Sequence, residues 1–227
     1  MWPLWVAALA SGCGLVSSDP TSFDLSVPDK AFTIDATSWQ VDDAKAAEYL
    51  TIPCGTAPSV CGYAAIDTCG MNCSGTCNEV TETCDLSLEV SLYRPIDLVT
   101  EQPELRTVED DLMVTSVDVE YEVVANTLSI ATPALEVFVA PSSVLEPSDP
   151  LATRIATIEP IDSAAITNGG RPLVFTEAGK AALTAMMADY QAPFNVIVGS
   201  RLWIRQNEPV PDGKLDAVIR IKARAGL

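Results

Sequence analysis

The chain has 227 residues, 48% of them hydrophobic and 19% charged, which is enough for a domain with a buried core. Its net charge of −18 is uneven: residues 1–153 hold 24 acidic and 4 basic side chains, and residues 154–227 hold 7 and 9. An acidic surface is repelled by phosphate backbones, so the charge argues against nucleic acid as a partner. Histidine, the commonest general base and metal ligand, is absent, and we expect no cofactor.

The N-terminus has the features of an export signal. Residues 2–10 form an apolar run that fits a signal-peptide core but falls short of the roughly 20 residues that cross a bilayer. The stretch LASGC at 9–13 resembles the lipobox of bacterial lipoproteins. This resemblance implies that residues 1–12 are removed as a signal peptide and that Cys13 becomes a lipidated N-terminus. The alternative is an unpaired thiol near the end of the chain.

The lipoprotein resemblance also implies a location. Several acyl chains on Cys13 anchor a protein firmly, whereas one holds it only marginally. Gly14 follows the cysteine, which favours the outer membrane, so we expect the membrane itself to be a partner through the lipid. Residues 13–30 are rich in Ser, Asp and Pro and predict a tether, with a strand-like alternation of apolar residues near its end.

Residues 51–85 are predicted to be a disulfide-rich insertion. The segment has little apolar periodicity and must be held by cross-links at its six cysteines, Cys54, Cys61, Cys69, Cys73, Cys77 and Cys84. An exported protein meets an oxidising compartment, so three disulfides are the leading interpretation, with any of 15 pairings. Zinc is the alternative, but it favours CxxC pairs, often with histidine. The insertion either stiffens a loop or presents a recognition surface.

The rest of the chain predicts an antiparallel β-sandwich, immunoglobulin-like or LEA-like, of about 7–9 strands. Residues 31–50 hold its first strand and a connection, and residues 86–227 hold the remainder. Alternation of apolar and polar residues marks the strands, at 31–36, 86–92, 117–123, 135–139, 152–159, 172–175, 194–205 and 214–223. The Pro-Asp-Gly turn at 211–213 predicts a hairpin between the last two.

One α-helix is predicted to cross this sandwich. Thr176 can cap its N-terminus, and Pro193 marks its end. Its apolar residues recur at the spacing of a single helical face, at Leu183, Met186, Met187 and Tyr190. The helix is therefore expected to pack on the core.

Two stretches resemble the LEA-like, WHy-type sandwich domain. They are VEYEVVANTLSIATPALEVFVAP at 119–141 and FTEAGKAALTAMMADYQAPFNVIVGSRLWI at 175–204. The family has a strand, an Asn-containing turn, a Pro-flanked strand and a helix leading into a further strand. The resemblance implies stress protection or an accessory role in an envelope protein, and it supplies no catalytic residues.

Other candidate functional residues are few. Glu109, Asp110 and Asp111 form the densest acidic run, either a solvated turn or a calcium site. Trp39 and Trp203 are either exposed binding aromatics or part of the sandwich core. Arg201 and Arg205 are expected to face solvent or pair with the acidic half. The favoured function is a non-catalytic, lipid-anchored envelope protein that binds a protein or glycan. The alternatives are a calcium-dependent adhesin and a carboxylate-based glycan-active enzyme.

Overall fold

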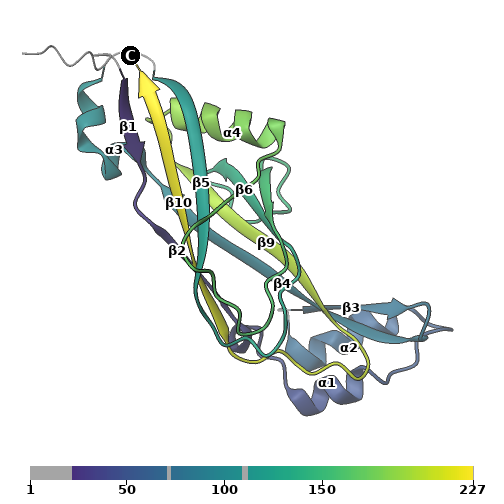
Figure 1. Cartoon of the computed structure of the whole chain (residues 1–227). Helices are drawn as coiled ribbons and strands as arrows, with labels where there is room; N and C mark the ends of the chain where they lie inside the picture. The colour runs from purple at the N-terminus through teal and green to yellow at the C-terminus, as the bar shows by residue number, and fades with distance from the viewer. Residues whose placement is uncertain (1–21, 71–72, 109–111, 227) are drawn as a thin grey trace, which may run out of the picture.

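The computed structural model describes residues 22–70, 73–108 and 112–226. These residues form two antiparallel sheets of five strands each, packed face to face, with four α-helices (Figure 1). The mainly β, two-sheet architecture expected from the alternation of apolar residues is confirmed. The strand count exceeds the expected 7–9, because a strand lies inside the segment predicted as a tether and another inside the cysteine-rich insertion.

The first sheet is built on its C-terminal strand. Strand β10 (Lys214–Gly226) pairs along one side with β5 (Met113–Asn126), which in turn pairs with the short β8 (Arg171–Pro172). Along its other side β10 pairs with β1 (Ser22–Ser26) and then with β2 (Lys30–Asp35). The strand expected at 31–36 therefore joins the sandwich from before the insertion, as predicted.

The second sheet has the order β3-β4-β9-β6-β7. Its strands are β3 (Cys73–Asn78), β4 (Thr83–Ile96), β9 (Phe194–Ile204), β6 (Leu135–Pro141) and β7 (Thr153–Ile158). The inward-facing residues of both sheets belong to one buried cluster, among them Leu86 and Leu88 from β4 and Val119 and Ile221 from the first sheet. Burial of such side chains is the main stabilising term of the sandwich.

Helix α4 (Glu177–Ala188) is the helix that the sequence predicts. The hydroxyl oxygen of Thr176 accepts a hydrogen bond from the backbone N–H of Gly179 at 2.9 Å, which confirms the expected cap. Leu183 and Met187 are fully buried against the sandwich. The helix ends at Ala188, ahead of Pro193, so the proline does not itself stop it.

Three further helices were not predicted, so the expectation of one crossing helix covers only part of the helical structure. They are α1 (Asp43–Tyr49), α2 (Val60–Cys69) and the single turn α3 (Leu98–Glu101), accompanied by two 3₁₀ turns (Ala36–Trp39 and Pro103–Thr107). Side-chain caps start α1 and α3, through Asp42 and Asp97. The buried residues of α2 are Cys, Ala and Thr, which do not make the apolar stripe by which helices are found in sequence.

The turn at 211–213 does not make the expected hairpin. Strand β9 lies in the second sheet and β10 in the first, so the connection carries the chain from one sheet to the other. Gly213 has a φ of 84°, a left-handed conformation that favours glycine. A Cβ atom there would lie 2.1 Å from the carbonyl oxygen of Thr127. At Gly213 the backbone of the connection between β9 and β10 therefore lies so close to the residue after β5 that a side chain at this position would not fit.

We predict that Gly213→Ala lowers the free energy of unfolding by about 3 kcal/mol or more, because a clash with backbone adds to left-handed strain. Gly169→Ala is the matched control: its φ is 88°, but no atom lies within 4 Å of the added Cβ. That variant should lose only about 1 kcal/mol. Urea unfolding of both variants measures the difference. Equal losses would mean that the close approach to Thr127 is absent in solution.

Candidate functional site

The cysteine-rich segment forms a projecting unit at one end of the molecule. We call residues 43–70 and 73–84 the disulfide-stapled unit; it consists of α1, α2, β3 and the start of β4. Figure 1 shows this unit at the lower right, away from the end where β1 starts and β10 finishes. Ser22 pairs with Gly226 at that upper end, whereas Asp35, which leads toward the unit, pairs with Lys214.

All six cysteines of the segment pair with one another. Cys54 is bridged to Cys77 and Cys61 to Cys84, and the third bridge joins Cys69 to Cys73. Their Cα–Cα distances of 5.7, 5.4 and 6.0 Å fall within the usual range for disulfides. The prediction of three bridges within 54–84 is thus supported, and the structure selects one of the 15 pairings that the sequence left open.

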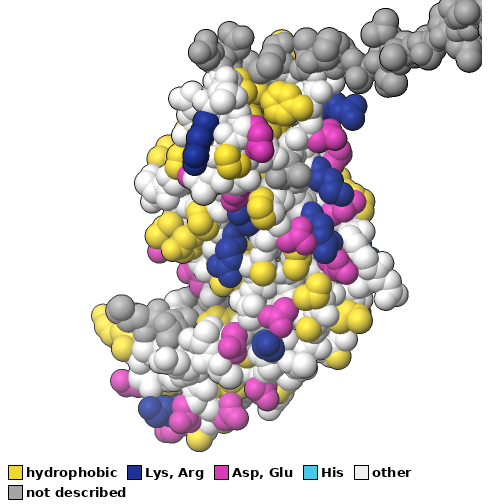
Figure 2. Space-filling model, turned by 90° about the vertical axis from the view of Figure 1, so that its left-hand side faces the viewer, with side chains coloured by type: hydrophobic (Ala, Val, Ile, Leu, Met, Phe, Trp, Pro, Cys, Tyr) yellow, Lys and Arg dark blue, Asp and Glu magenta, His cyan; other side chains and the backbone are white. Residues whose placement is uncertain are grey.

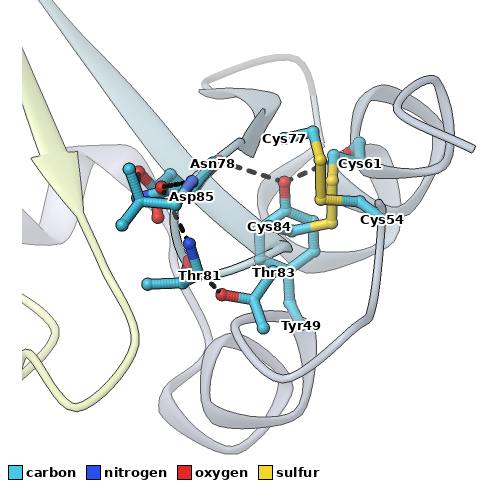
Figure 3. The surroundings of a disulfide bond; sticks show 10 residues. Tyr49, Cys54, Cys61, Cys77, Asn78, Thr81, Thr83, Cys84 and Asp85 are labelled. Carbon is cyan, nitrogen blue, oxygen red and sulfur yellow. Dashed lines mark hydrogen bonds between the residues drawn. A yellow bond between two sulfur atoms is a disulfide. The ribbon is translucent and has the colours of Figure 1, made fainter. Parts of the chain in front are cut away.

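Two of these bridges fasten the same point of the β3–β4 hairpin. Cys77 and Cys84 lie directly opposite each other in the ladder. Cys77 is bridged to Cys54, which lies before helix α2, and Cys84 is bridged to Cys61 in the first turn of that helix (Figure 3). Each closes 23 residues of sequence. The loop before α2 and the helix itself are therefore held against the hairpin without an apolar core of their own.

Tyr49 occupies the space between the helix and the hairpin. Its side chain is buried, and its hydroxyl lies 3.2 Å from the carbonyl oxygens of both Cys61 and Asp85, to which it donates (Figure 3). A Cβ at Gly75 would lie 2.0 Å from this hydroxyl, so only glycine fits at that point of β3. Burial, with the nearby charge of Asp85, raises the pKa of Tyr49 to about 12.

Asp85 links the unit to the sandwich. Its side chain accepts a hydrogen bond from the amide of Asn78 at 3.0 Å and pairs with Arg205 at 3.7 Å. Arg205 follows β9, so the ion pair reaches from the unit to the crossing between the two sheets. The expectation that Arg205 pairs with the acidic half is met here. Within the described residues, the second oxygen of Asp85 is buried without a hydrogen-bond partner.

The unit exposes three large apolar side chains, two of them on the same side of α2. Tyr63 is 76% exposed and Ile66 is 58% exposed, at positions i and i+3 of α2, and Val80 in the β3–β4 turn is 92% exposed. Side chains three positions apart lie on the same side of a helix. Aromatic residues of this kind are enriched where proteins bind each other. This surface, unlike the cysteines, was not identified from the sequence, since nothing in α2 distinguishes exposed from buried apolar residues.

The other predicted site residues do not gather in one place. Cys13 and the acidic run Glu109, Asp110 and Asp111 lie outside the described residues. Trp39 is buried, with its indole N–H donating to the carbonyl oxygen of Glu89 at 3.1 Å. Trp203 is half-buried on β9, so neither tryptophan presents an open face.

The cysteine sulfurs also bear on the zinc alternative. The Sγ atoms of Cys54, Cys61 and Cys84 lie within 4.8 Å of one another, close enough for thiolates around one ion. In the structure each of these sulfurs is bonded to another sulfur, and a disulfide sulfur is not a thiolate ligand. In the oxidised unit these sulfurs therefore serve as cross-links.

Comparisons with known proteins give little guidance. No protein-family model and no curated protein matches the chain. Among solved structures, it is similar to a crystal structure of a provisionally assigned glycoside hydrolase from Bacteroides thetaiotaomicron, with 15% identity and a TM-score of 0.21. The match covers 70% of this chain and 60% of that one. A likeness at this TM-score carries no argument about fold or function.

We predict that one tyrosine of the folded protein ionises at about pH 12 and that Tyr49→Phe removes this titration step. In the unfolded chain Tyr49 ionises near pH 10, about the usual value for the phenol. The folded pKa is raised, so this group stabilises the fold below pH 10 and the contribution is lost as the pH rises from 10 to 12. Ultraviolet titration of phenolate absorbance in folded and urea-unfolded protein measures both values. A wild-type curve identical to that of Tyr49→Phe above pH 11 would contradict the burial of the hydroxyl.

Proposed function

We propose that the protein is a lipid-anchored envelope lipoprotein without catalytic activity, which presents its disulfide-stapled unit to a protein or glycan partner. The observation that carries the proposal is the pairing of all six cysteines at 54–84 within that unit. Disulfides persist in exported proteins and are rare in reducing compartments. The pairing leaves Cys13, in its lipobox-like sequence, as the one cysteine available for lipid.

The arrangement of the two ends of the molecule supports this orientation. Strand β1 starts at the end opposite the unit (Figure 1). From Cys13 to Ser22 the chain advances nine residues, which span at most about 30 Å. A lipid on Cys13 would therefore hold the β1 end near the bilayer. Strands β4, β5 and β10, of 13 or 14 residues each, would then carry the unit away from it by about 40 Å.

The surface features fit recognition in the envelope. Figure 2 shows basic and acidic side chains interspersed over the face it presents, not separated by sign. Ion pairs such as those of Arg220 with Asp29 and Glu122 account for such mixing on the first sheet. The exposed Tyr63 and Ile66, on the same side of α2, form the surface of the unit best suited to a partner. No helix of the described residues is long and apolar enough to cross a membrane.

We further propose that the sandwich acts as an LEA-like accessory domain and that the anchor lies in the outer membrane. The similarity of 119–141 and 175–204 to that family and the glycine at position 14 support these two points. Helix α4 followed by β9 occurs in the order that the family resemblance implies.

Mass spectrometry of the protein isolated from cell envelopes tests the anchor. The mature chain should begin at Cys13, with a diacylglyceryl group on its sulfur and an acyl group on its amine. Mild alkaline hydrolysis should remove the two ester-linked acyl chains and leave the glyceryl thioether and the N-acyl group on Cys13. A mature chain that begins elsewhere, with an unmodified thiol at Cys13, would contradict the proposal.

Cross-linking in intact envelopes tests the recognition surface. We predict that Tyr63→Ser abolishes the cross-linked products of the wild-type protein, because an exposed aromatic anchor is lost while the disulfides remain. Val174→Ser is the matched control, since Val174 is equally exposed but lies outside the unit. Unchanged products from Tyr63→Ser, or equal losses from both variants, would show that the partner binds elsewhere.

A further inference from the structure

One edge of strand β4 is left open beside the disulfide-stapled unit. Strand β3 covers this edge only as far as Leu88, which pairs with Cys73 at the start of β3. Among the strands that the structure describes, only β9, on the other side, pairs with β4 from Glu89 to Ile96. Strand β2 lies alongside but is hydrogen-bonded to β10 in the other sheet. Two sheet edges thus face each other across the open seam of the sandwich.

Among the described residues, Trp39 and Arg94 bridge this seam, and Arg94 also lies over the ring of Phe32 and donates to the carbonyl oxygen of Tyr93. The indole of Trp39 donates to the carbonyl oxygen of Glu89, and Arg94 donates through its Nε to the carbonyl oxygen of Ala31 at 2.6 Å. Because backbone groups alternate sides along a strand, the N–H and C=O of Ser91 point the same way as the carbonyl of Glu89. Within the described residues, no strand pairs with Ser91 on this side.

A cleft of about 520 Å³ follows the open edge. It is lined by residues of β4, of β2 and the 3₁₀ turn before α1, and of the start of β3. Its charged lining residues are Asp35, Glu89, Glu146 and Arg201. The volume lies within the range of clefts that hold small ligands.

Asp35 caps the 3₁₀ turn by accepting hydrogen bonds from Thr37, whereas the other charged side chains of the cleft are free to meet a ligand. Glu89 and Arg201 are directly opposite each other on β4 and β9, a position in which opposite charges commonly pair. Within the described residues, neither side chain forms an ion pair or a hydrogen bond, and the same holds for Glu146. Three carboxylates against one guanidinium favour a ligand that carries positive charge as well as a carboxylate.

We propose that this cleft binds a short extended peptide that carries an ammonium group and a free terminal carboxylate. The peptide backbone pairs with the open edge of β4 at Ser91, as an added strand. Arg201 binds the carboxylate, and Glu89 and Glu146 attract the ammonium group. From residue 89 to residue 93 the edge is about 13 Å long, room for about four residues of an extended peptide. The binding does not depend on the lipid anchor or on the surface of Tyr63.

Open backbone groups are the reason for choosing a peptide over a sugar. A strand edge offers N–H and C=O groups at the spacing that a second strand requires. Sugars commonly stack on exposed aromatic rings, but the ring of Trp39, the aromatic residue lining the cleft, is buried.

The test is an NMR titration of the full, oxidised, ¹⁵N-labelled chain with the tetrapeptide Ala-Lys-Ala-Ala, its ends free. We expect saturable shifts centred on the amides of Glu89, Ser91 and Tyr93. The trisaccharide of β-1,4-linked N-acetylglucosamine is the second probe and should leave these amides unmoved. Absence of saturation at 10 mM peptide, or saturable shifts of the same amides with the trisaccharide alone, would overturn the proposal.

Variants separate backbone pairing from charge. Ser91→Pro removes the N–H that faces the cleft, a change that an edge position tolerates, and should weaken peptide binding at least about tenfold. Ser91→Ala keeps the N–H and should bind like the wild type. Arg201→Ala should weaken binding of the free peptide about tenfold but not that of its C-terminal amide. The Arg201 comparison stands even where Ser91→Pro does not fold, and equal binding of the free peptide by Arg201→Ala and wild type would contradict the assignment.

Discussion

Two adjacent disulfides attach helix α2 to the β3–β4 hairpin, and the disulfide-stapled unit depends on this constraint. Cys77 and Cys84 face each other across the ladder, so both bridges act on one point of the hairpin. Closing loops of 23 residues each restricts the unfolded chain by about 3 kcal/mol per bridge. Tyr49 is the one large side chain buried in the described helices of the unit, and the other buried helical positions hold Ala, Cys and Thr. Cross-linking replaces the core that it lacks.

Strand β4 transmits this constraint to the sandwich. Its first residues pair with β3 inside the unit, and its later residues pair with β9 in the body. Tyr49 and Asp85 add polar contacts at the junction, and Arg205 extends them to the crossing between the sheets.

The pairing of β4 also explains the open seam between the two sheets. Strand β3 begins at Cys73, opposite Leu88, so within the described residues β4 runs on beyond Leu88 with no strand paired to it on that side, and the cleft lies beside this stretch.

The sequence predicted what depends on local periodicity. Alternation placed β2, β5, β6, β9 and β10 within a few residues, and the capping threonine located α4. Periodicity could not show that β9 and β10 belong to different sheets, because alternation indicates which side of a strand is buried and not which strand lies next to it. It also missed α1 and α2. Ala46, Ala65 and Cys61 are buried there, and small residues give no apolar stripe.

The candidate site was predicted in part. The cysteine count and spacing identified the six residues that would pair, but their pairing depends on which of them the fold brings together, and here that is set by the register of β3 against β4. Neither the apolar surface at Tyr63 nor the cleft at Ser91 has a sequence signal, since each depends on which neighbours are missing. Which residues line the cleft and which lie in the core can be told only once the order of the strands is known.

Peptide mapping of the protein under non-reducing conditions tests the central claim most directly. Digestion should yield one linked product with Cys54 joined to Cys77, one with Cys61 joined to Cys84, and a third bridge between Cys69 and Cys73. Cys13 should appear in none of them. Free thiols at these six positions, a different pairing, or a bridge to Cys13 would contradict the account of a unit clamped to its hairpin and a cysteine left for lipid.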